Sequence, residues 1–183
     1  MDKKIIFLKG ENMEKRDLYD KNKHLTGSTI YKGKPIPDDS YILVVLAFLQ
    51  NSEGKFLMQK RSQRKNGKWA ATGGHPKSGE NSIQGIITEI GEEIGLEVTP
   101  QELDLVYSGR QDDEHVFFDV YYVKKDFDEN NLVLQEEEVE SVKWFSYDEV
   151  MQLINNHLFF ENHAEEFIRM IDIFKQRGVN LEK

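Results

Sequence analysis

The sequence predicts an α/β protein in which a mixed central sheet lies between two layers of helices, an α/β/α sandwich. Apolar residues at three- and four-residue spacing indicate amphipathic helices, and short runs rich in branched and aromatic residues indicate strands. These elements are interspersed without the regular alternation of a doubly wound sheet. A chain of 183 residues can bury one sizeable core, and we find no internal repeat. We therefore expect a single domain.

The clearest strand signal is the apolar run YILVVLAFLQN over residues 41–51, which predicts a strand buried on both faces. A turn and the alternating segment 55–62 predict a second strand paired with the first. A long polar loop is expected at 126–138. Other extended segments are expected at 17–27 (with a turn), 69–72, 103–109, 114–125 and 141–145.

Three helices are expected. Isoleucines recur on one face of residues 82–94, with Ser82 as the expected N-terminal cap and Gly95 as the left-handed residue that ends the helix. A capping box predicts the start of a second helix over 146–154. An apolar stripe over 160–174 predicts a C-terminal helix.

Composition excludes several classes of function. A net charge of −9 argues against a sequence-independent grip on nucleic acid polymers or on anionic membranes. The absence of cysteine excludes disulfides, thiolate zinc sites and a cysteine nucleophile. We find no signal peptide and no membrane span, so we expect a cytoplasmic protein. A monomer and a homodimer are both compatible with the sequence.

The N-terminus is interpreted separately. Met13 begins a stretch that would make a natural start, and Lys9-Gly10-Glu11 is a peptide whose codons can spell a purine-rich ribosome-binding site. We interpret residues 1–12 as a translated leader or a poorly ordered extension, and residues 13–183 as the domain.

Glu89, Glu92 and Glu93 share one face near the end of the first predicted helix. Like charges at this spacing repel, and the helix C-terminus disfavours anions. A divalent cation would offset both effects, and carboxylate oxygens suit Mg²⁺ or Mn²⁺. The alternative is a solvated acidic face in an acidic protein.

The spacing around these glutamates resembles the Nudix box of the Nudix hydrolases. Gly74 is followed after five residues by Glu80, then after seven by position 88 and the segment EIGEEIGL at 89–96. Eight of the nine specified positions match. The flanking strand pattern is also similar, so the resemblance covers roughly residues 41–154.

The resemblance implies a Nudix-like fold and a metal-dependent pyrophosphohydrolase that cleaves a diphosphate linkage in a small metabolite. We expect a nucleoside diphosphate joined to another group as substrate. Bound Mg²⁺ or Mn²⁺ would neutralise the diphosphate, polarise its phosphorus and lower the pKa of an attacking water. By resemblance, Glu89, Glu92 and Glu93 would ligate the metal near the carbonyl of Gly74, with Glu80 supporting the loop. One candidate base is Glu89. The other candidates are Glu136, Glu137 and Glu138, for which the alternative interpretation is a solvated loop without a catalytic role.

Thr88 is the one departure from the pattern, because the family has arginine there. That arginine usually holds a catalytic glutamate, so its absence predicts a less positive and less oriented cluster. The candidates to replace it are Lys60, Arg61 and Lys77. The competing function is therefore a non-catalytic nucleotide-binding module that keeps the fold.

Six cations between residues 55 and 68 lead directly into the glycine loop. They predict either a solubilising surface or a rim that receives phosphate, since arginine binds phosphate with two parallel hydrogen bonds. Trp69 is expected to stack on a base or to belong to the core. The candidates for substrate binding are Arg61, Arg64, Lys68 and His75.

The segment Gly73-Gly74-His75-Pro76 resembles the C-G-H-P of type I isopentenyl-diphosphate isomerases, a second branch of the same fold. There the cysteine is the catalytic acid or base and the histidine binds metal. Here Gly73 replaces the cysteine, and no histidine lies between Ser28 and Gly74. Isomerase is therefore the less favoured alternative. The other histidines, which show no ligand spacing and are expected to be structural or exposed, are His24, His115, His157 and His163.

Overall fold

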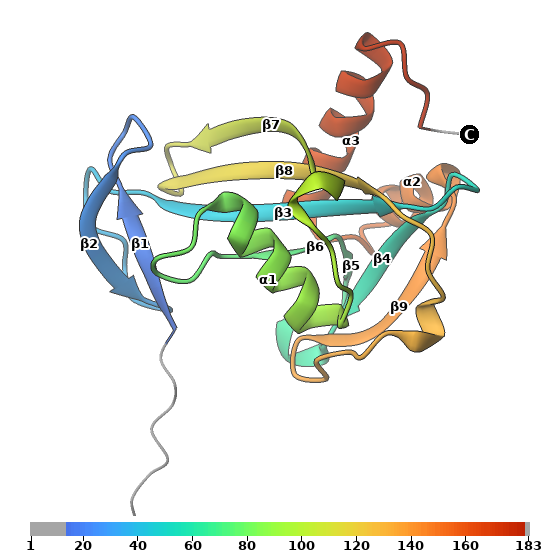
Figure 1. The fold of residues 1–183 in the computed structure, drawn as a ribbon, viewed down its shortest axis with the longest axis horizontal. Helices are drawn as coiled ribbons and strands as arrows, with labels where there is room; N and C mark the ends of the chain where they lie inside the picture. The colour runs from blue at the N-terminus through green and yellow to red at the C-terminus, as the bar shows by residue number, and fades with distance from the viewer. Residues whose placement is uncertain (1–13, 182–183) are drawn as a thin grey trace, which may run out of the picture.

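The computed structural model describes residues 14–181, so the interpretation of residues 1–12 falls outside the described part of the chain. A large mixed sheet, a separate hairpin and three α-helices make up this part (Figure 1). The strands are β1 (Lys15–Tyr19), β2 (Leu25–Tyr31), β3 (Ile42–Gln50), β4 (Phe56–Arg61), β5 (Trp69–Ala70), β6 (Thr72–Gly74), β7 (Asp104–Gln111), β8 (Val116–Lys124) and β9 (Val139–Phe145). The helices are α1 (Ser82–Ile94), α2 (Tyr147–Asn155) and α3 (Glu161–Gln176).

Strand β3 is the centre of the sheet. It pairs in parallel with β8 along its whole length and antiparallel with β4 and β6, which confirms a mixed sheet. The expected pairing of β3 with β4 is present only at Leu49–Leu57 and Gln50–Phe56. Beyond these pairs β6 takes the place beside β3, and β5 takes the place beside β4, while β9 pairs with the other edge of β4 along its whole length. This arrangement brings the glycine-containing strand β6 next to the middle of the sheet.

Helices cover both faces of the sheet, which confirms the expected α/β/α sandwich. The isoleucine stripe of α1, including the fully buried Ile86 and Ile90, packs on one face with Val45 and Leu57. Helices α2 and α3 pack on the opposite face. Strand β3 is buried on both faces, as its apolar sequence predicts.

The start of α1 differs from our expectation by one residue. Asn81, not Ser82, caps the helix, because its side chain accepts a hydrogen bond from the Gln84 N–H at 2.9 Å while the Gln84 side chain accepts from the Asn81 N–H. The Ser82 hydroxyl instead donates to Asp119 at 2.6 Å. Gly95 ends the helix in the left-handed conformation, as expected.

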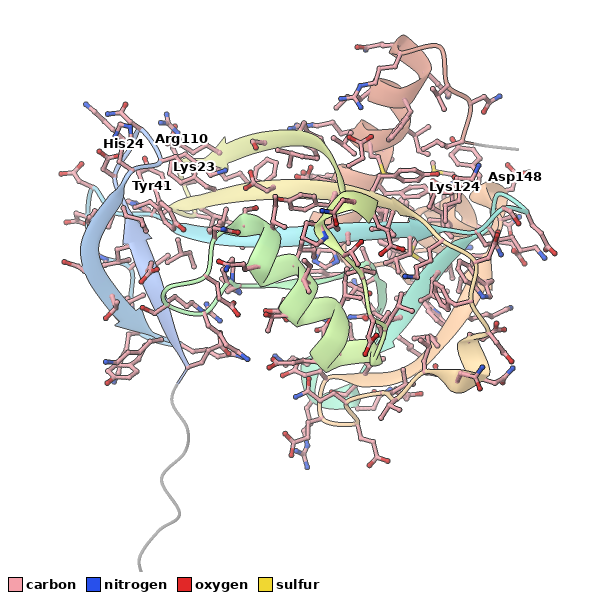
Figure 2. All side chains as sticks on the ribbon, in the orientation of Figure 1. Lys23, His24, Tyr41, Arg110, Lys124 and Asp148 are labelled. Carbon is pink, nitrogen blue, oxygen red and sulfur yellow. The ribbon has the colours of Figure 1, made fainter. Side chains whose placement is uncertain are left out.

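The N-terminal segment forms a longer hairpin, β1–β2, than the strand and turn expected at 17–27. Asp17 accepts hydrogen bonds from the Ser78 hydroxyl and the Gly79 N–H, which tie the hairpin to the glycine loop. At its turn Lys23 forms an ion pair with Asp119 at 2.5 Å. Figure 2 shows Lys23, with His24, at the same end of the molecule as Tyr41 and Arg110.

The loop before β9 agrees with the sequence-based expectation, with one small difference. The expected polar loop at 126–138 contains a short 3-10 turn at Glu129–Asn131 and ends at β9. Within residues 14–181 we find no helix that is long and apolar enough to cross a membrane.

The contact between α3 and the sheet centres on Phe167. Its fully buried ring lies 5.4 Å from the Phe48 ring and 5.0 Å from the Phe56 ring. We expect Phe167→Ala to lower the free energy of unfolding by about 3–5 kcal/mol, because it leaves a cavity between the helix and the sheet. Urea denaturation measures this change.

The matched control is the neighbouring Ile168, which is 40% exposed on the other side of the same helix. Ile168→Ala should lower the free energy of unfolding by roughly 1 kcal/mol or less. Equal losses in the two variants would contradict the assignment of Phe167 to the centre of this contact.

Candidate functional site

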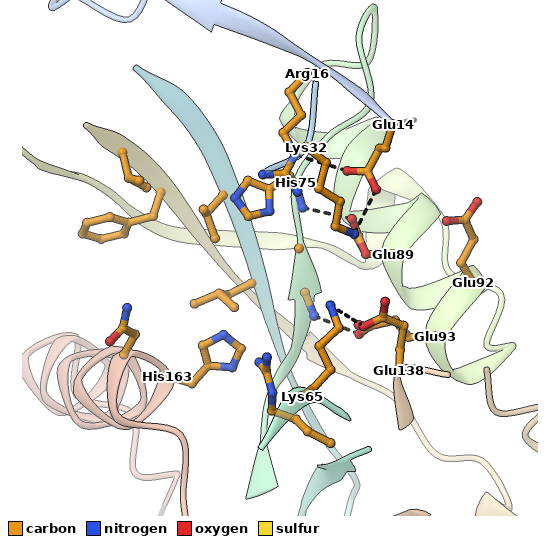
Figure 3. A pocket seen from close by; sticks show the side chains of 18 of the residues that line it. Glu14, Arg16, Lys32, Lys65, His75, Glu89, Glu92, Glu93, Glu138 and His163 are labelled. Carbon is orange, nitrogen blue, oxygen red and sulfur yellow. Dashed lines mark hydrogen bonds and ion pairs between the residues drawn. The ribbon is translucent and has the colours of Figure 1, made fainter. Parts of the chain in front are cut away.

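An open cavity of about 1140 Å³ is lined by residues of the central strands β3, β4, β6 and β8 and of helices α1 and α3. The hairpin lines it with Glu14, Arg16 and Lys32, and the loop before β9 lines it with Gln135, Glu137 and Glu138. Figure 3 shows the hairpin side chains next to His75 and Glu89, with Lys65, Glu138 and His163 farther along the same opening. The cavity therefore joins segments from both ends of the chain.

Two of the three helix glutamates point into the cavity and are held by backbone donors of β6 and of the residue that follows it. Glu89 accepts a hydrogen bond from the His75 N–H at 3.0 Å. Glu93, only 8% exposed, accepts hydrogen bonds from the Gly73 N–H at 3.3 Å and from the Gln59 amide at 2.9 Å. These contacts fix the orientation of both carboxylates without neutralising them.

Burial of these carboxylates changes their acidity. Burial, followed by the charge of Glu93, raises the pKa of Glu89 to about 8. Burial also raises the pKa of Glu93 to about 7, although hydrogen bonds from Gln59 and Gly73 act in the opposite direction. Among the described residues, no ion pair involves either carboxylate. Without a cation the fold therefore favours the protonated carboxyls, and a bound divalent cation would stabilise their charged forms.

Gly74 allows α1 to approach β6 this closely. A Cβ atom on Gly74 would lie 2.5 Å from a carboxylate oxygen of Glu89, which is far inside van der Waals contact. Any other residue at position 74 would therefore push the carboxylate away from the strand. Steric contact with Glu89 therefore explains why this position of the motif is glycine in this chain.

Glu92 lies at the rim of the cavity. On the helix it lies about 100° from Glu93, and it forms an ion pair with Lys77. Figure 3 shows it on the outer side of α1, away from His75. The structure therefore separates the three glutamates into two inside the cavity and one at its edge.

Position 88 has a structural role although arginine is absent. The Thr88 hydroxyl donates to one oxygen of Glu80 at 2.8 Å, and the other oxygen accepts from the Lys77 N–H at 2.8 Å. Thr88 thus ties the helix to Glu80 and to the glycine loop. Of the other candidates to replace arginine, Lys60 pairs with Glu140, and Arg61 faces Glu93 without a direct ion pair.

The donor set fits a divalent cation by its chemistry. Glu89 and Glu93 supply hard oxygen ligands, and burial raises their pKa values, so the metal-free site disfavours their charged forms. No group of three histidine or acidic side chains in residues 14–181 is already arranged around one point. The side chains of the site, Glu92 above all, would have to move to complete a coordination shell.

Two of the four residues expected to bind substrate line the cavity. Arg61 is half-buried, with its guanidinium carbon 4.4 Å from the centre of the Phe160 ring, and burial lowers its pKa. His75 is also in the lining, and burial, followed by the charge of Arg16, lowers its pKa to about 3. Arg64 and Lys68 are not in the lining, and Lys68 pairs with Glu161.

The loop glutamates also separate. Glu137 and Glu138 line the cavity, whereas Glu136 does not. Glu138 forms an ion pair with Lys65 at 2.9 Å. Trp69 belongs to the core, since its ring packs edge-on against Phe145 at 4.8 Å.

Sequence reasoning missed two groups of cavity residues. Glu14, Arg16 and Lys32 carry no motif, and only the docking of the hairpin brings them to the site. The second group, on α3, could have been found from the sequence. Polar residues at helical spacing interrupt the apolar stripe of this helix before Phe167. These residues are Asn162, His163 and Glu166.

The chain is similar to known proteins in sequence and in fold. The NUDIX domain family model matches residues 40–169. An uncharacterized Nudix hydrolase of Listeria monocytogenes is 30% identical over 146 residues, covering 77% of this chain and 85% of the relative. The crystal structure of DR0079 from Deinococcus radiodurans has a TM-score of 0.71 at 22% identity, covering 86% of this chain and 99% of that chain.

A further solved structure is the NUDIX domain of Shewanella oneidensis NrtR complexed with ADP ribose. It has a TM-score of 0.57 at 19% identity, covering 76% of this chain and 89% of that chain. Because both identities are low, these two structural similarities support the fold alone. The family match, which spans most of the chain, and the Listeria relative confirm the resemblance inferred from Gly74 to Leu96: this chain belongs to the Nudix hydrolase family.

Proposed function

We propose that this protein is a metal-dependent pyrophosphohydrolase that cleaves the diphosphate linkage of a nucleoside diphosphate joined to another group. The observation that carries the proposal is the pair of buried carboxylates, Glu89 and Glu93, which face basic side chains across one cavity. Anionic phosphates and the divalent cations that accompany them both find complementary groups there. The ADP ribose in the NrtR complex contains a linkage of this kind.

We assign Glu89, Glu92 and Glu93 to holding Mg²⁺ or Mn²⁺, with the Gly74 carbonyl close by. When bound, such an ion neutralises the diphosphate and lowers the pKa of an attacking water. Gln59 and the β6 backbone keep the Glu93 carboxylate in place.

The remaining groups act on substrate and water. Arg61 supplies a positive charge to a phosphate between the two carboxylates and α3. Arg16 and Lys32, which both pair with Glu14 at 3.2 Å, supply charge from the hairpin side. Glu89 is our candidate base, because its carboxylate is fixed by His75 inside the cavity. Glu137 and Glu138 are alternative bases at the opposite rim.

The contacts of Thr88 favour turnover over a binding module without catalysis. Because Thr88 fixes Glu80 and backbone donors fix the two buried carboxylates, the arrangement does not depend on arginine at position 88. The chain therefore keeps an oriented carboxylate pair despite its departure from the family motif.

The first test concerns Glu93. Glu93→Gln nearly preserves shape but removes a metal-binding charge, so we expect kcat to fall at least 100-fold, or about 2.7 kcal/mol. The assay measures product formation from ADP-ribose, dinucleotides, nucleoside triphosphates and sugar nucleotides, with Mg²⁺ or Mn²⁺. Glu97→Gln, at an exposed position just beyond α1, is the matched control and should keep wild-type kcat. Full activity of Glu93→Gln at limiting metal would disprove its assigned role.

The second test uses the pH dependence of stability without metal. The pKa of Glu89 is about 8 in the folded protein, above its ordinary value of 4.5, so the fold favours the protonated carboxyl. Its contribution to stability is complete below about pH 4.5 and is lost as pH rises through about 8. In EDTA, Glu89→Gln should therefore gain stability relative to wild type between pH 5 and pH 8.5.

The expected gain is at least about 1 kcal/mol, or roughly 2–4 °C in Tm for a chain of this size. Thermal unfolding of both proteins at the two pH values measures it. At pH 8.5, added Mg²⁺ should raise the Tm of wild type more than that of Glu89→Gln. Parallel Tm profiles for the two proteins would contradict the assigned burial of this charge.

The third test concerns Thr88. Thr88→Val keeps the side-chain shape but removes the donor to Glu80, so the glycine loop should loosen and kcat should fall roughly fivefold, as expected for one hydrogen bond of about 1 kcal/mol. Thr88→Ser keeps the hydroxyl and should stay within about twofold of wild type. If Thr88→Val and Thr88→Ser have the same kcat at every magnesium concentration, the hydrogen bond from Thr88 to Glu80 does not contribute to catalysis.

A further inference from the structure

The cavity wall opposite α1 contains buried polar atoms that have no hydrogen-bond partner. Among the residues that the structure describes, four buried side-chain polar atoms lack a partner, and three of them belong to residues that line this cavity. These three are Arg61 Nε, His163 Nδ1 and Glu166 Oε2. Unpaired buried polar groups are rare because each costs free energy, so their concentration around one cavity points to a ligand that pairs with them.

His163 presents a hydrogen-bond acceptor. The carbonyl of Ala71 accepts a hydrogen bond from the imidazole ring, and Nδ1 has no partner, so we assign the ring proton to Nε2. Burial, followed by the charge of Arg61, lowers the pKa of His163 to about 3, so the ring is neutral at pH 7. Its Nδ1 therefore offers a lone pair and requires an N–H or O–H donor from the ligand.

Glu166 presents a second acceptor one helical turn farther along α3. The side chains of His163 and Glu166 are in the same buried wall, at 7% and 8% exposure. Burial raises the pKa of Glu166, and the charge of Arg169 opposes this shift. The unpaired Oε2 adds a second polar atom that a donor on the ligand can satisfy.

Apolar surfaces surround these acceptors. Leu46 and Phe118 line the cavity from the sheet, and Tyr107 holds the Phe118 ring in place by an edge-on contact at 5.9 Å. Just before α3, the Phe160 ring packs edge-on against His163 at 5.0 Å. A planar ring with polar hydrogens at its edge suits this combination of flat apolar surfaces and buried acceptors.

Arg61 connects this wall to the carboxylate site. Its positive charge acts on His163 on one side and on Glu93 on the other. A phosphate beside Arg61 would therefore have the carboxylates in one direction and the α3 wall in the other. This order matches a nucleotide, in which the phosphates and the base lie at opposite ends.

We propose that Leu46, Phe118, His163 and Glu166 form a nucleobase site, the α3 subsite, which lies beside Arg61 and selects a base that carries an exocyclic amino group. The proposal rests on the proposed function, because it places the phosphates of the same substrate at the carboxylates. An adenine amino group donates to an acceptor such as His163 Nδ1. The carbonyl of hypoxanthine at the same position is itself an acceptor, so the carbonyl oxygen and His163 Nδ1 would both remain unpaired.

The experiment compares the binding of AMP and IMP to the full chain by titration calorimetry in EDTA. The two nucleotides have the same ribose and phosphate and differ along one edge of the base: AMP has an amino group at C6 and an unprotonated N1, and IMP has a carbonyl at C6 and an N1–H. We expect wild type to bind AMP at least about tenfold more tightly than IMP, which is the effect of about 1.4 kcal/mol. Equal affinities, or no binding of either nucleotide at millimolar concentration, would overturn the α3 subsite.

Two variants of His163 separate its two ring nitrogens. His163→Gln places an amide donor near the Nε2 position, so it can keep the bond to Ala71 while it loses the Nδ1 acceptor. His163→Asn places an amide oxygen near the Nδ1 position and loses the bond to Ala71. We expect the preference for AMP to fall to about twofold or less in His163→Gln and to remain in His163→Asn.

A preference that persists unchanged in His163→Gln would overturn the role of Nδ1. Because the wild-type comparison needs no variant, the proposal stays testable even if a substitution unfolds the protein. Binding without metal also separates this proposal from hydrolysis. A protein that prefers AMP but turns over no substrate in the panel would support the α3 subsite and refute the proposed reaction.

Discussion

The close approach of β6 to α1 determines the geometry of the cavity. Two backbone N–H groups, from Gly73 and His75, point at Glu93 and Glu89, and Gly74 leaves room for the Glu89 carboxylate between them. Hydrogen bonds orient the carboxylates, but the effect of burial is larger and raises both pKa values. The same contact therefore creates oriented ligands whose charged forms a cation would stabilise.

Around these two carboxylates, the basic side chains of the cavity form ion pairs with other acidic residues. Glu14 pairs with Arg16 and Lys32, Lys65 pairs with Glu138, and Lys77 pairs with Glu92. Such partly exposed ion pairs contribute little stability and can open at small cost. A cation and a diphosphate entering together would exchange partners with these groups, because each then finds an opposite charge. The acidic net charge of the chain is thus compatible with an anionic substrate.

The two walls of the cavity differ in chemistry. The α1 wall offers charged oxygens, and the α3 wall offers neutral or partly buried acceptors among apolar rings. Arg61 lies between them with its guanidinium against Phe160. This division is physically consistent with one ligand that has a charged part and an uncharged planar part.

The sequence by itself determined the features that depend on local periodicity. The apolar run of β3, the isoleucine face of α1 and the spacing from Gly74 to Glu93 are repeats over a few residues, and they predicted the sandwich and the acidic face. Tertiary structure decided which of these side chains enter the cavity. Glu92 pairs outside while Glu93 lies inside, because neighbours on a helix point about 100° apart and only one direction meets β6.

Contacts between distant segments also lay beyond the sequence. The hairpin docks through Asp17 on the glycine loop, and α3 packs across the sheet, so Arg16 and His163 reach the same cavity from opposite ends of the chain. The ring proton of His163 and its neutral state follow from burial beside Ala71 and Arg61. No local pattern encodes these contacts, because they arise only when the packed core fixes which surfaces face one another.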